Sequence, residues 1–307
     1  TNATTSAITV TYTAVAITSG ASACPGDTSR YTITVNPKPL VPAQTASVCS
    51  GDSLRFAPAN NPPASIVPPG TLYTWTFTDN PNVSAETNQP TAVDSVRQLL
   101  VNTTNIPQTV VYTVTPTSGA AGSCVGNPFQ LTVTVSPTPA IPTLTDTICS
   151  GDVFVVTPQQ GVPNAATIIP VGTTYSWSAP VLPPGISGAA AGTNAPNISG
   201  SLTNTTLAAA TITYIVTPVS GISSNCVGQP FQVKITVKPR ASVSNNPLNQ
   251  SVCNGNTTTA VNWTSLSPGA TYAWTVVSSG SVTGFLPNGN GPTLGTMTLT
   301  NTGIAQD

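Results

Sequence analysis

The 307-residue sequence contains no histidine, a single methionine and very little charge. Without histidine, neither a Ser–His nor a Cys–His nucleophile can be assembled. Charged residues make up 5% of the chain, and its seven lysine and arginine residues are scattered along it. An ordinary soluble domain has about 25%. Because no basic patch remains to bind a phosphate backbone, the composition argues against a nucleic-acid partner.

Long apolar runs and helical periodicity are also missing. No apolar run approaches the roughly 20 residues that cross a bilayer, so we expect no membrane contact within this segment. Prolines punctuate the chain throughout, and no apolar stretch keeps a helical period. The hydrophobic residues, 39% of the total, instead alternate with Thr, Ser and Asn. This pattern predicts packed β-sheets rather than disorder.

The most informative feature present is a repeat of about 100 residues, the size of a small domain. Two motifs occur three times: Cys49–Asp52, Cys149–Asp152 and Cys253–Asn256; Tyr73–Trp75, Tyr175–Trp177 and Tyr272–Trp274. A third occurs twice, at Cys124–Gln130 and Cys226–Gln232. Asn2 and Asn301 occupy the same point of the repeat, three periods apart. We therefore expect either a slice of a longer protein or one period of a polymer that its neighbours complete.

Strand signals and proline-rich joints predict the modules. The β-rich runs Thr109–Thr115 and Phe129–Val135 indicate a hairpin, which recurs at Ile8 to Val35 and Ile212 to Val237. Pro-rich segments at 37–39, 137–139 and 239–240 read as stiff joints. We predict the C-terminal hairpin of a module at 1–39, whole modules at 40–139 and 140–239, and an incomplete one at 240–307. The fold class is all-β, a tandem array of Ig-like Greek-key β-sandwiches.

Together the Cys-Ser-Gly-Asp turn, the Tyr-x-Trp strand, the Tyr-x-Val-Thr-Pro strand and the Cys-Val-Gly-x-Pro-Phe turn resemble PKD-like modules. Such modules occur in giant surface adhesins of Bacteroidota, including gliding adhesins exported by the type IX secretion system. The resemblance implies an extracellular, surface-attached protein. In PKD domains proper, Asp-Phe-Gly-Asp-Gly follows the tryptophan. This chain has Thr76–Asp79, Ser178–Pro180 and Thr275–Val277 there, so no calcium or glycan role tied to that acidic turn is implied.

Six cysteines at matched positions in a lysine-poor chain indicate an oxidising compartment. Pairing within modules would join Cys49 to Cys124 and Cys149 to Cys226. In a sandwich, the Cys-x-Gly turn follows the first strand (A), in the A–B turn, and the second cysteine lies in the F–G turn, between the last two strands that form the hairpin. These two turns lie at opposite ends of strand G, roughly 25 Å apart at about 3.3 Å per residue. A disulfide needs about 4.4–6.8 Å between Cα atoms.

Head-to-tail modules would bring the F–G turn of one against the A–B turn of the module before. That arrangement favours a Cys49–Cys226 bond between modules, with pairing inside modules as the alternative. The remaining cysteines would then bond outside the segment: Cys24 and Cys124 upstream, Cys149 and Cys253 downstream.

The remaining candidate residues favour structural roles. Trp75, Trp177 and Trp274 are expected to anchor the cores, whereas Trp263 has no counterpart in other modules. Asp52 and Asp152 stand alone in turns, so we expect no metal site and no cofactor. Asp79 and Glu86 are the only carboxylates that could form a glycosidase pair, which needs roughly 5–9.5 Å between them. We predict that the protein is not an enzyme.

Two kinds of modification signal are present. Ser53, Ser95 and Thr147 lie in Asp-(Ser/Thr)-hydrophobic segments that resemble the O-glycosylation acceptor of Bacteroidota. Asn102 and Asn204 lie in Asn-x-Thr sequons. Strand-edge polarity explains these two asparagines equally well.

The function predicted from the sequence is a stalk segment of a large secreted adhesin or filament, which gives reach, stiffness and force transmission for attachment or gliding. Its partners would be neighbouring modules. One alternative is glycan binding through the loops from Thr78 to Thr91 and from Ala179 to Asn197. The other is a fibre subunit, in which the 1–39 hairpin completes the 240–307 module of another chain.

Overall fold

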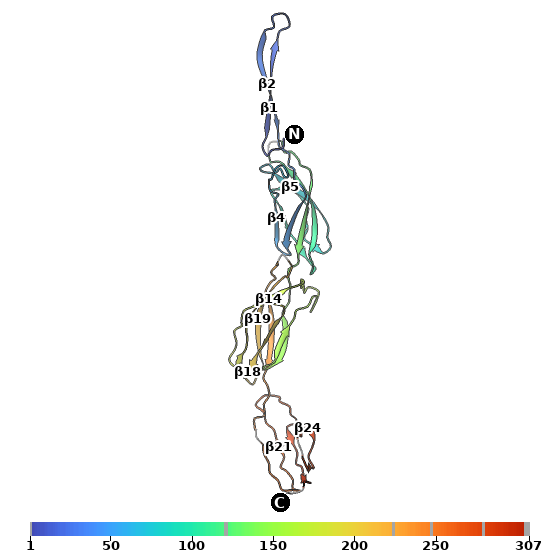
Figure 1. Ribbon diagram of the computed structural model, residues 1–307, viewed down its shortest axis with the longest axis vertical. Coiled ribbons are helices and arrows are strands. Elements are labelled where there is room, and N and C mark those ends of the chain that lie inside the picture. Colours follow the sequence, from blue (N-terminus) through green and yellow to red (C-terminus); the bar gives the residue numbers. More distant parts are fainter. Residues whose placement is uncertain (1, 120–121, 223–224, 246–247, 278–279, 304–307) are drawn as a thin grey trace.

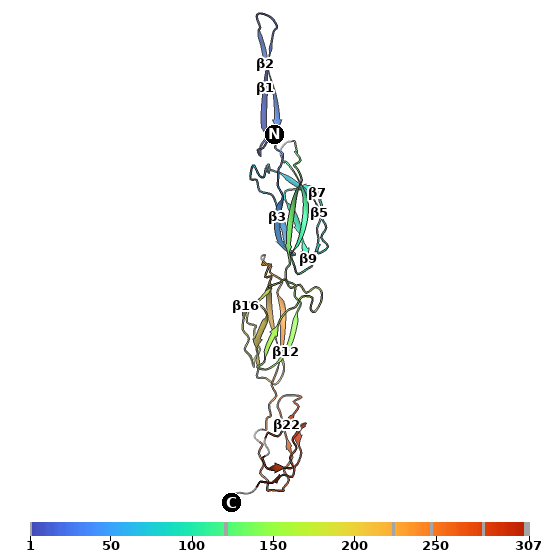
Figure 2. The same cartoon turned by 45° about the vertical axis from the view of Figure 1, so that its right-hand side comes forward.

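The computed structural model describes residues 2–119, 122–222, 225–245, 248–277 and 280–303. Within these ranges the regular secondary structure is entirely β-strand. The chain forms an extended row of four units: a hairpin, two sandwiches and an open C-terminal unit (Figure 1). A second view shows the same units following one another without folding back (Figure 2). The hairpin and the C-terminal unit therefore lie at opposite ends of a rod (Figure 1).

The first unit is a long antiparallel hairpin of β1 (Ile8–Ile17) and β2 (Pro25–Val35). Its alternating β-branched and aromatic residues explain the regular ladder, in which Tyr12 faces Tyr31. No third strand joins this sheet in the described part of the chain. Every residue of both strands is consequently exposed.

The second unit is a complete sandwich. Its larger sheet has the order β3 (Gln44–Cys49), β11 (Phe129–Ser136), β10 (Gln108–Thr117), β5 (Leu72–Thr78), β7 (Gln89–Val93). The strand pairs on its other side are β4 (Ser53–Phe56) with β8 (Val96–Leu99) and β6 (Val83–Ser84) with β9 (Val101–Asn102). Because β3 runs parallel to β11, the first and last strands of the module are neighbours. This is the Ig-like Greek-key arrangement.

The third unit repeats this topology. Its larger sheet has the order β12 (Leu144–Cys149), β20 (Phe231–Lys238), β19 (Ala210–Val219), β14 (Thr174–Trp177), β16 (Gly192–Ala195). Opposite it lie β13 (Val153–Val156) with β17 (Ile198–Ser201) and β15 (Ile186–Ser187) with β18 (Thr203–Asn204). The fold is therefore all-β, with two tandem Ig-like sandwiches, as the sequence predicted.

Each sandwich has its own core, built by the inward residues of alternating strands. In the second unit Val110, Tyr112 and Val114 are fully buried on one strand of the hairpin, and Leu131 and Val133 on the other. Burial raises the pKa of the Tyr112 phenol, and the nearby Glu86 carboxylate raises it further. The core tyrosine therefore stays neutral and acts as a large apolar side chain.

The C-terminal unit is open. It has three short strand pairs: β21 (Val261–Asn262) with β25 (Thr293–Leu294), β22 (Ala273–Thr275) with β24 (Asn288–Asn290), and β23 (Val282–Thr283) with β26 (Thr300–Asn301). None of its described residues is buried. The unit contains no counterpart of the β10–β11 hairpin in the described residues, which accounts for the absence of a closed core.

The segments expected to be glycan-binding loops, from Thr78 to Thr91 and from Ala179 to Asn197, contain strands instead. Residues 78–91 include β6 and the start of β7, and residues 179–197 include β15 and β16. β7 and β16 extend the larger sheets by pairing with β5 and β14, each with an irregular register. The irregularity and the short pairings hide these strands from a pattern search.

Candidate functional site: the joint between the two sandwiches

The two sandwiches are joined covalently. Cys49 ends β3 of the first sandwich, and Cys226 lies in the F–G turn of the second. Their sulfur atoms form a disulfide, with 5.7 Å between the Cα atoms. Cys226 is almost fully buried at 1% exposure. This is the bond between modules that the head-to-tail argument favoured, and the alternatives, Cys49–Cys124 and Cys149–Cys226, are not present.

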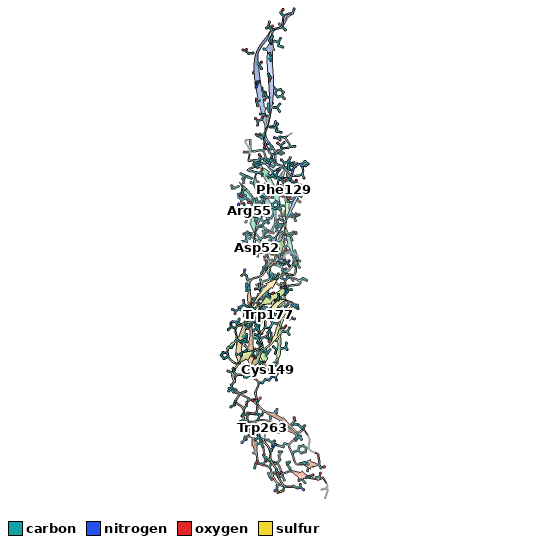
Figure 3. The ribbon with its side chains drawn as sticks, turned by 60° about the vertical axis from the view of Figure 1, so that its left-hand side comes forward. Asp52, Arg55, Phe129, Cys149, Trp177 and Trp263 are labelled. Atoms are coloured by element: carbon teal, nitrogen blue, oxygen red, sulfur yellow. A yellow bond between two sulfur atoms is a disulfide. The ribbon has the colours of Figure 1, made fainter. Side chains whose placement is uncertain are left out.

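The other cysteines form no disulfide in the described structure. Cys24, Cys149 and Cys253 are exposed, and Cys124 is half-buried. In Figure 3, Cys149 lies at the end of its sandwich that faces the C-terminal unit. Their expected bonds to partners outside the segment stay a prediction.

Backbone contacts reinforce the disulfide. The Ser50 amide donates to the Ser136 carbonyl over 2.8 Å, and the Thr138 hydroxyl donates to the Ser50 carbonyl over 2.9 Å. The turn that follows Cys49 is thus tied to the segment that leaves the first sandwich for the second. These bonds fix the start of the proline-rich joint against the turn beside the disulfide.

A glycine and a proline give the joint its close packing. A Cβ atom placed on Gly228 would lie 2.3 Å from the Pro139 carbonyl oxygen and 2.9 Å from Pro218. The preceding joint has the same contact, since a Cβ on Gly126 would lie 2.6 Å from the Pro39 carbonyl oxygen. Only glycine permits the F–G turn to approach the preceding module this closely. The Cys-Val-Gly motif is therefore a joint motif.

The joint after the second sandwich is held by different side-chain contacts. Arg240 takes the place of Thr138: its guanidinium donates to the Ser150 carbonyl and pairs with the Asp152 carboxylate. Both side chains are largely exposed, so the ion pair adds little stability. Its value is geometric, because it fixes the start of the next module against the turn that carries Cys149.

At the same end of each complete sandwich, a buried asparagine hydrogen-bonds to carbonyls of a loop and of the last strand. Asn102 is 1% exposed, and its amide nitrogen donates to the carbonyls of Ile106 and Val135 over 2.8 and 2.9 Å. Asn204 makes the same pair of bonds and is 5% exposed. The amides are fully engaged, so these two sequons are structural and not surface glycan acceptors. The recurrence of Asn at one point of the repeat was the signal for this role.

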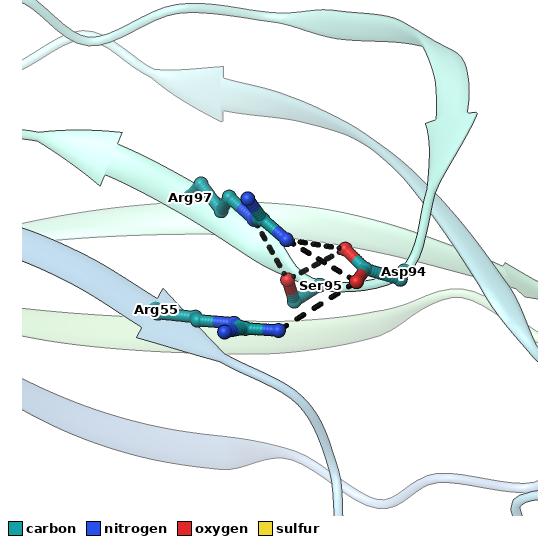
Figure 4. A network of polar contacts seen from close by, with 4 residues as sticks. All are labelled: Arg55, Asp94, Ser95 and Arg97. Carbon is teal, nitrogen blue, oxygen red and sulfur yellow. Dashed lines mark hydrogen bonds and ion pairs between the residues drawn. The ribbon is translucent and has the colours of Figure 1, made fainter.

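Ser95, one of the expected O-glycosylation sites, is part of a polar network (Figure 4). Its hydroxyl donates to Asp94 and accepts from Arg97, and the residue is 1% exposed. The bond from Ser95 and the charges of Arg97 and Arg55 lower the pKa of the Asp94 carboxyl. Burial leaves Ser95 little access to a modifying enzyme in the folded module, and its role as an acceptor stays a prediction.

The other two acceptor candidates, Ser53 and Thr147, are exposed. Each lies on a strand that faces solvent at that position. Their modification stays a prediction.

The tryptophans divide into two classes. Trp75 and Trp177 belong to the two cores, and the indole nitrogen of each donates to a backbone carbonyl, of Thr87 and Ala190 respectively, over 3.0 Å. Trp274 is half-buried, and its ring lies 5.2 Å from that of Trp263, centroid to centroid. No counterpart of the β10–β11 hairpin covers Trp274 in the described residues, and its role as a core anchor stays a prediction.

Asp79 and Glu86, the carboxylates considered as a glycosidase pair, make no hydrogen bond or ion pair with each other in the described structure. Asp79 is exposed, Glu86 is half-buried beside Tyr112, and no short contact between the two carboxylates is present among the described residues. The described part of the chain also contains no cluster of three residues able to hold a metal ion. Asp52 lies in the turn after β3, where its backbone amide donates to the Cys49 carbonyl.

Several solved structures of tandem extracellular domains are similar to the chain at low identity. Human CDH23 EC21–23 is 16% identical with a TM-score of 0.27, covering 84% of this chain and 92% of that one. Protocadherin gamma B2 cadherin domains 1–5 are 13% identical with a TM-score of 0.21, covering 95% of this chain and 58% of that one. Chicken CNTN1 FN1–FN3 is 12% identical with a TM-score of 0.28, covering 75% of this chain and 78% of that one. No curated protein matches the sequence.

Two stretches of the chain match one family. The described residues include no helix that could span a membrane. The family model for the PKD-like domain matches residues 46–139 and 146–241, which together make up more than half of the chain and coincide with the two sandwiches. The chain thus belongs to the PKD-like domain family, as a tandem array whose two complete members are joined by a disulfide.

Proposed function

We propose that this chain is a stalk segment of a large secreted, surface-attached adhesin or filament, and that it transmits tension with little extension. The observation that carries the proposal is the Cys49–Cys226 bond. A disulfide within one module would stabilise that module alone. A disulfide between modules stiffens the array itself.

The bond creates a short covalent path for force. Tension that enters through β3 reaches Cys49, crosses to Cys226 and continues into β20. The segment between the two cysteines, which are 177 positions apart in sequence, therefore carries little of it. Fully extended, those residues would span about 600 Å at about 3.3–3.6 Å each. The disulfide holds the same two points 5.7 Å apart. Most of both sandwiches is thereby shielded from the load.

The spacing of the remaining cysteines extends this path. Each F–G cysteine is followed about 25 residues later by an A–B cysteine, which corresponds to roughly 85 Å of extended chain. Bonds of the same kind at every joint would make the path alternate between one disulfide and one such short segment. A long array would then resist lengthening even where its β-sheets were lost.

The composition suits an exposed spacer. With 5% charged residues and no histidine, few interactions change with salt or pH. The recurring joint contacts of Gly126 and Gly228 favour one repeated orientation of neighbouring modules. Family membership supports an extracellular location, where disulfides persist. The segments proposed as glycan loops contain no aromatic residue, and nothing in their structure favours glycan binding over the spacer role.

Single-molecule stretching tests the proposal. A chain held at both ends is extended under oxidising conditions and compared with the Cys49→Ser/Cys226→Ser variant. The variant should reach a contour length greater by about 600 Å, the extended length of the enclosed segment. Equal contour lengths would contradict the load path and with it the stalk function as stated here.

A further inference from the structure

A buried amide in the first complete sandwich lies against a hydroxyl group. Gln98, on β8, is 5% exposed. Its side-chain nitrogen lies 3.1 Å from the Thr87 hydroxyl oxygen, and its side-chain oxygen lies 3.3 Å from that same atom. Because the hydroxyl oxygen is near both the nitrogen and the oxygen of the amide, it also lies close to the carbon between them. Contacts of about 3–3.5 Å are those that a reaction between held groups requires.

The backbone of Thr87 holds this amide in place. The Thr87 backbone N–H donates to the Gln98 side-chain oxygen over 3.1 Å, and the side-chain nitrogen donates to the Thr87 carbonyl over 3.0 Å. The Trp75 indole donates to the same carbonyl over 3.0 Å and fixes it from the core side. The backbone N–H therefore points at the oxygen on which negative charge would develop if the hydroxyl attacked the amide carbon.

The second complete sandwich has neither the hydroxyl nor the amide. Ala190 accepts the indole bond there as Thr87 does here. Gly200 takes the place of Gln98 in the pairing of the two short strands. The Phe154 ring fills the space beside Gly200, where an added Cβ would lie 3.2 Å from it. The module therefore closes without the polar pair, and both members of the pair are absent together.

A carboxyl group adjoins the pair in sequence. Glu86 immediately precedes Thr87 and is half-buried, whereas the second complete sandwich has Ala189 at this point. The Glu86 Oε1 atom is buried and has no hydrogen-bond partner among the described residues. A buried polar atom without a partner is rare in native proteins and calls for an explanation. A carboxylate beside the pair can accept the hydroxyl proton and return it to a leaving nitrogen.

We propose that Thr87 and Gln98 react with each other to form an ester bond within the first complete sandwich. The Thr87 Oγ1 atom bonds to the Cδ carbon of Gln98, the Cδ–Nε2 bond breaks, and the hydroxyl proton leaves with the nitrogen as ammonia. Nothing is oxidised or reduced, and no other reactant is consumed. Ammonia is protonated and diluted in water, and Thr87 is exposed, so it can leave. The burial of Gln98 then protects the ester from hydrolysis.

The ester ties the two sheets of the sandwich together. Thr87 lies between β6 and β7, and β7 belongs to the larger sheet, whereas Gln98 lies on β8 in the opposite one. The bond closes a loop that spans 11 sequence positions around β7, so this strand cannot be drawn far from β8. This inference goes beyond the proposed function, because the disulfide joins two modules whereas the ester secures one module internally.

Mass spectrometry of the purified, reduced chain tests the ester directly. We expect a mass lower than that of the sequence by one ammonia. Trypsin cleaves after Arg55 and Arg97, so the ester should join peptides 56–97 and 98–234. Mild alkali should separate the two peptides and leave a carboxylate in place of the Gln98 amide. A chain of full mass whose two peptides are separate, after long incubation of the folded protein, would overturn the proposal. Ammonia loss confined to the Asn-Gly sequences at 254–255, 288–289 and 290–291 is asparagine cyclisation and would overturn it equally.

Two variants assign the roles of the residues. Thr87→Val keeps the size of the side chain and removes the nucleophile, so it should have full mass and separate peptides. A joined pair of peptides in this variant would refute Thr87 as the attacking group. Glu86→Gln should slow the appearance of the joined peptides by at least about 100-fold, the lower end of a general acid–base contribution. An unchanged rate would refute the proton transfer through Glu86. Detection of the Cys49–Cys226 peptide before reduction shows that each variant has folded.

Discussion

Equivalent hairpins of the repeat occur in two environments in this molecule, covered in the sandwiches and bare at residues 8–35. Tyr112 and Tyr12 occupy the same point of the repeat, yet their exposed fractions are 0% and 57%. Both hairpins keep the same cross-strand register. Local sequence is therefore sufficient for the ladder, whereas burial depends on strands that come from elsewhere in the module.

The largest expected effect comes from cutting the covalent link between the two complete sandwiches. In the chain-entropy description, closing a loop of 177 residues stabilises the folded state by about 5 kcal/mol. Urea unfolding followed by tryptophan fluorescence should show a loss of this order in Cys49→Ser/Cys226→Ser. Cys24→Ser in the bare hairpin is the control. An equal loss of stability in that variant would show that the Cys49–Cys226 disulfide is not the cause.

The next effect contrasts the covered and bare tyrosines directly. Tyr112→Ala should destabilise its sandwich by about 3–5 kcal/mol, the usual result of removing a buried aromatic ring. Tyr12→Ala, at an exposed position, should change the stability of the monomer by less than about 0.5 kcal/mol. Thermal or urea unfolding of both variants measures the difference.

Tyr112→Phe refines this comparison. The Tyr112 hydroxyl is buried and has no hydrogen-bond partner among the described residues. Because the hydroxyl gains nothing there, its removal should be neutral or slightly stabilising. A large loss in Tyr112→Phe would show that the hydroxyl is bonded and that packing alone does not explain the cost of Tyr112→Ala.

A smaller effect is expected at the asparagine that closes each module. Asn204→Ala leaves the carbonyls of Ala208 and Val237 without their donor in a buried site and should cost about 2 kcal/mol. Asn2 makes the same two kinds of bond at the base of the hairpin. Water can replace them there, so Asn2→Ala should cost less than about 1 kcal/mol. Equal losses in denaturant midpoint for Asn204→Ala and Asn2→Ala would show that burial of the asparagine does not set the cost.

The smallest effect concerns the ion pair beyond the second sandwich. Arg240→Met removes an exposed pair with Asp152 and should cost at most about 1 kcal/mol, declining with added salt. Thr138, its counterpart at the stapled joint, uses a neutral bond. Thr138→Ala should therefore show no salt dependence in the same unfolding series, and a salt-dependent loss there would contradict this assignment.

Much of the fold followed from the sequence because the repeat supplied independent copies of each signal. The hairpin could be predicted from strict alternation. The link between Cys49 and Cys226 could be predicted because the two cysteine-bearing turns of any one module lie at its opposite ends, which leaves the turn of the neighbouring module as the closer partner. The short strands β7 and β16 could not be predicted, since their irregular pairing leaves no period of two in the sequence.

Burial was the part that local patterns predicted least well. Trp274 matches Trp75 and Trp177 in its motif, yet only a complete module can bury it. Ser95 matches a modification motif, but its burial depends on the packing of β8 and on contacts with Asp94 and Arg97. Asn102 and Asn204 resemble surface sequons until the carbonyls that their amides bind are known. In each case the outcome depends on segments distant in sequence.

The central claim is that a disulfide joins neighbouring modules and that the cysteines of one module do not bond to each other. Non-reducing peptide mapping by mass spectrometry, on protein isolated from its native source, tests it most directly. Our account predicts a peptide that joins Cys49 to Cys226. Peptides that join Cys49 to Cys124 and Cys149 to Cys226 would instead show independently closed beads on flexible joints, and would contradict the load-bearing rod.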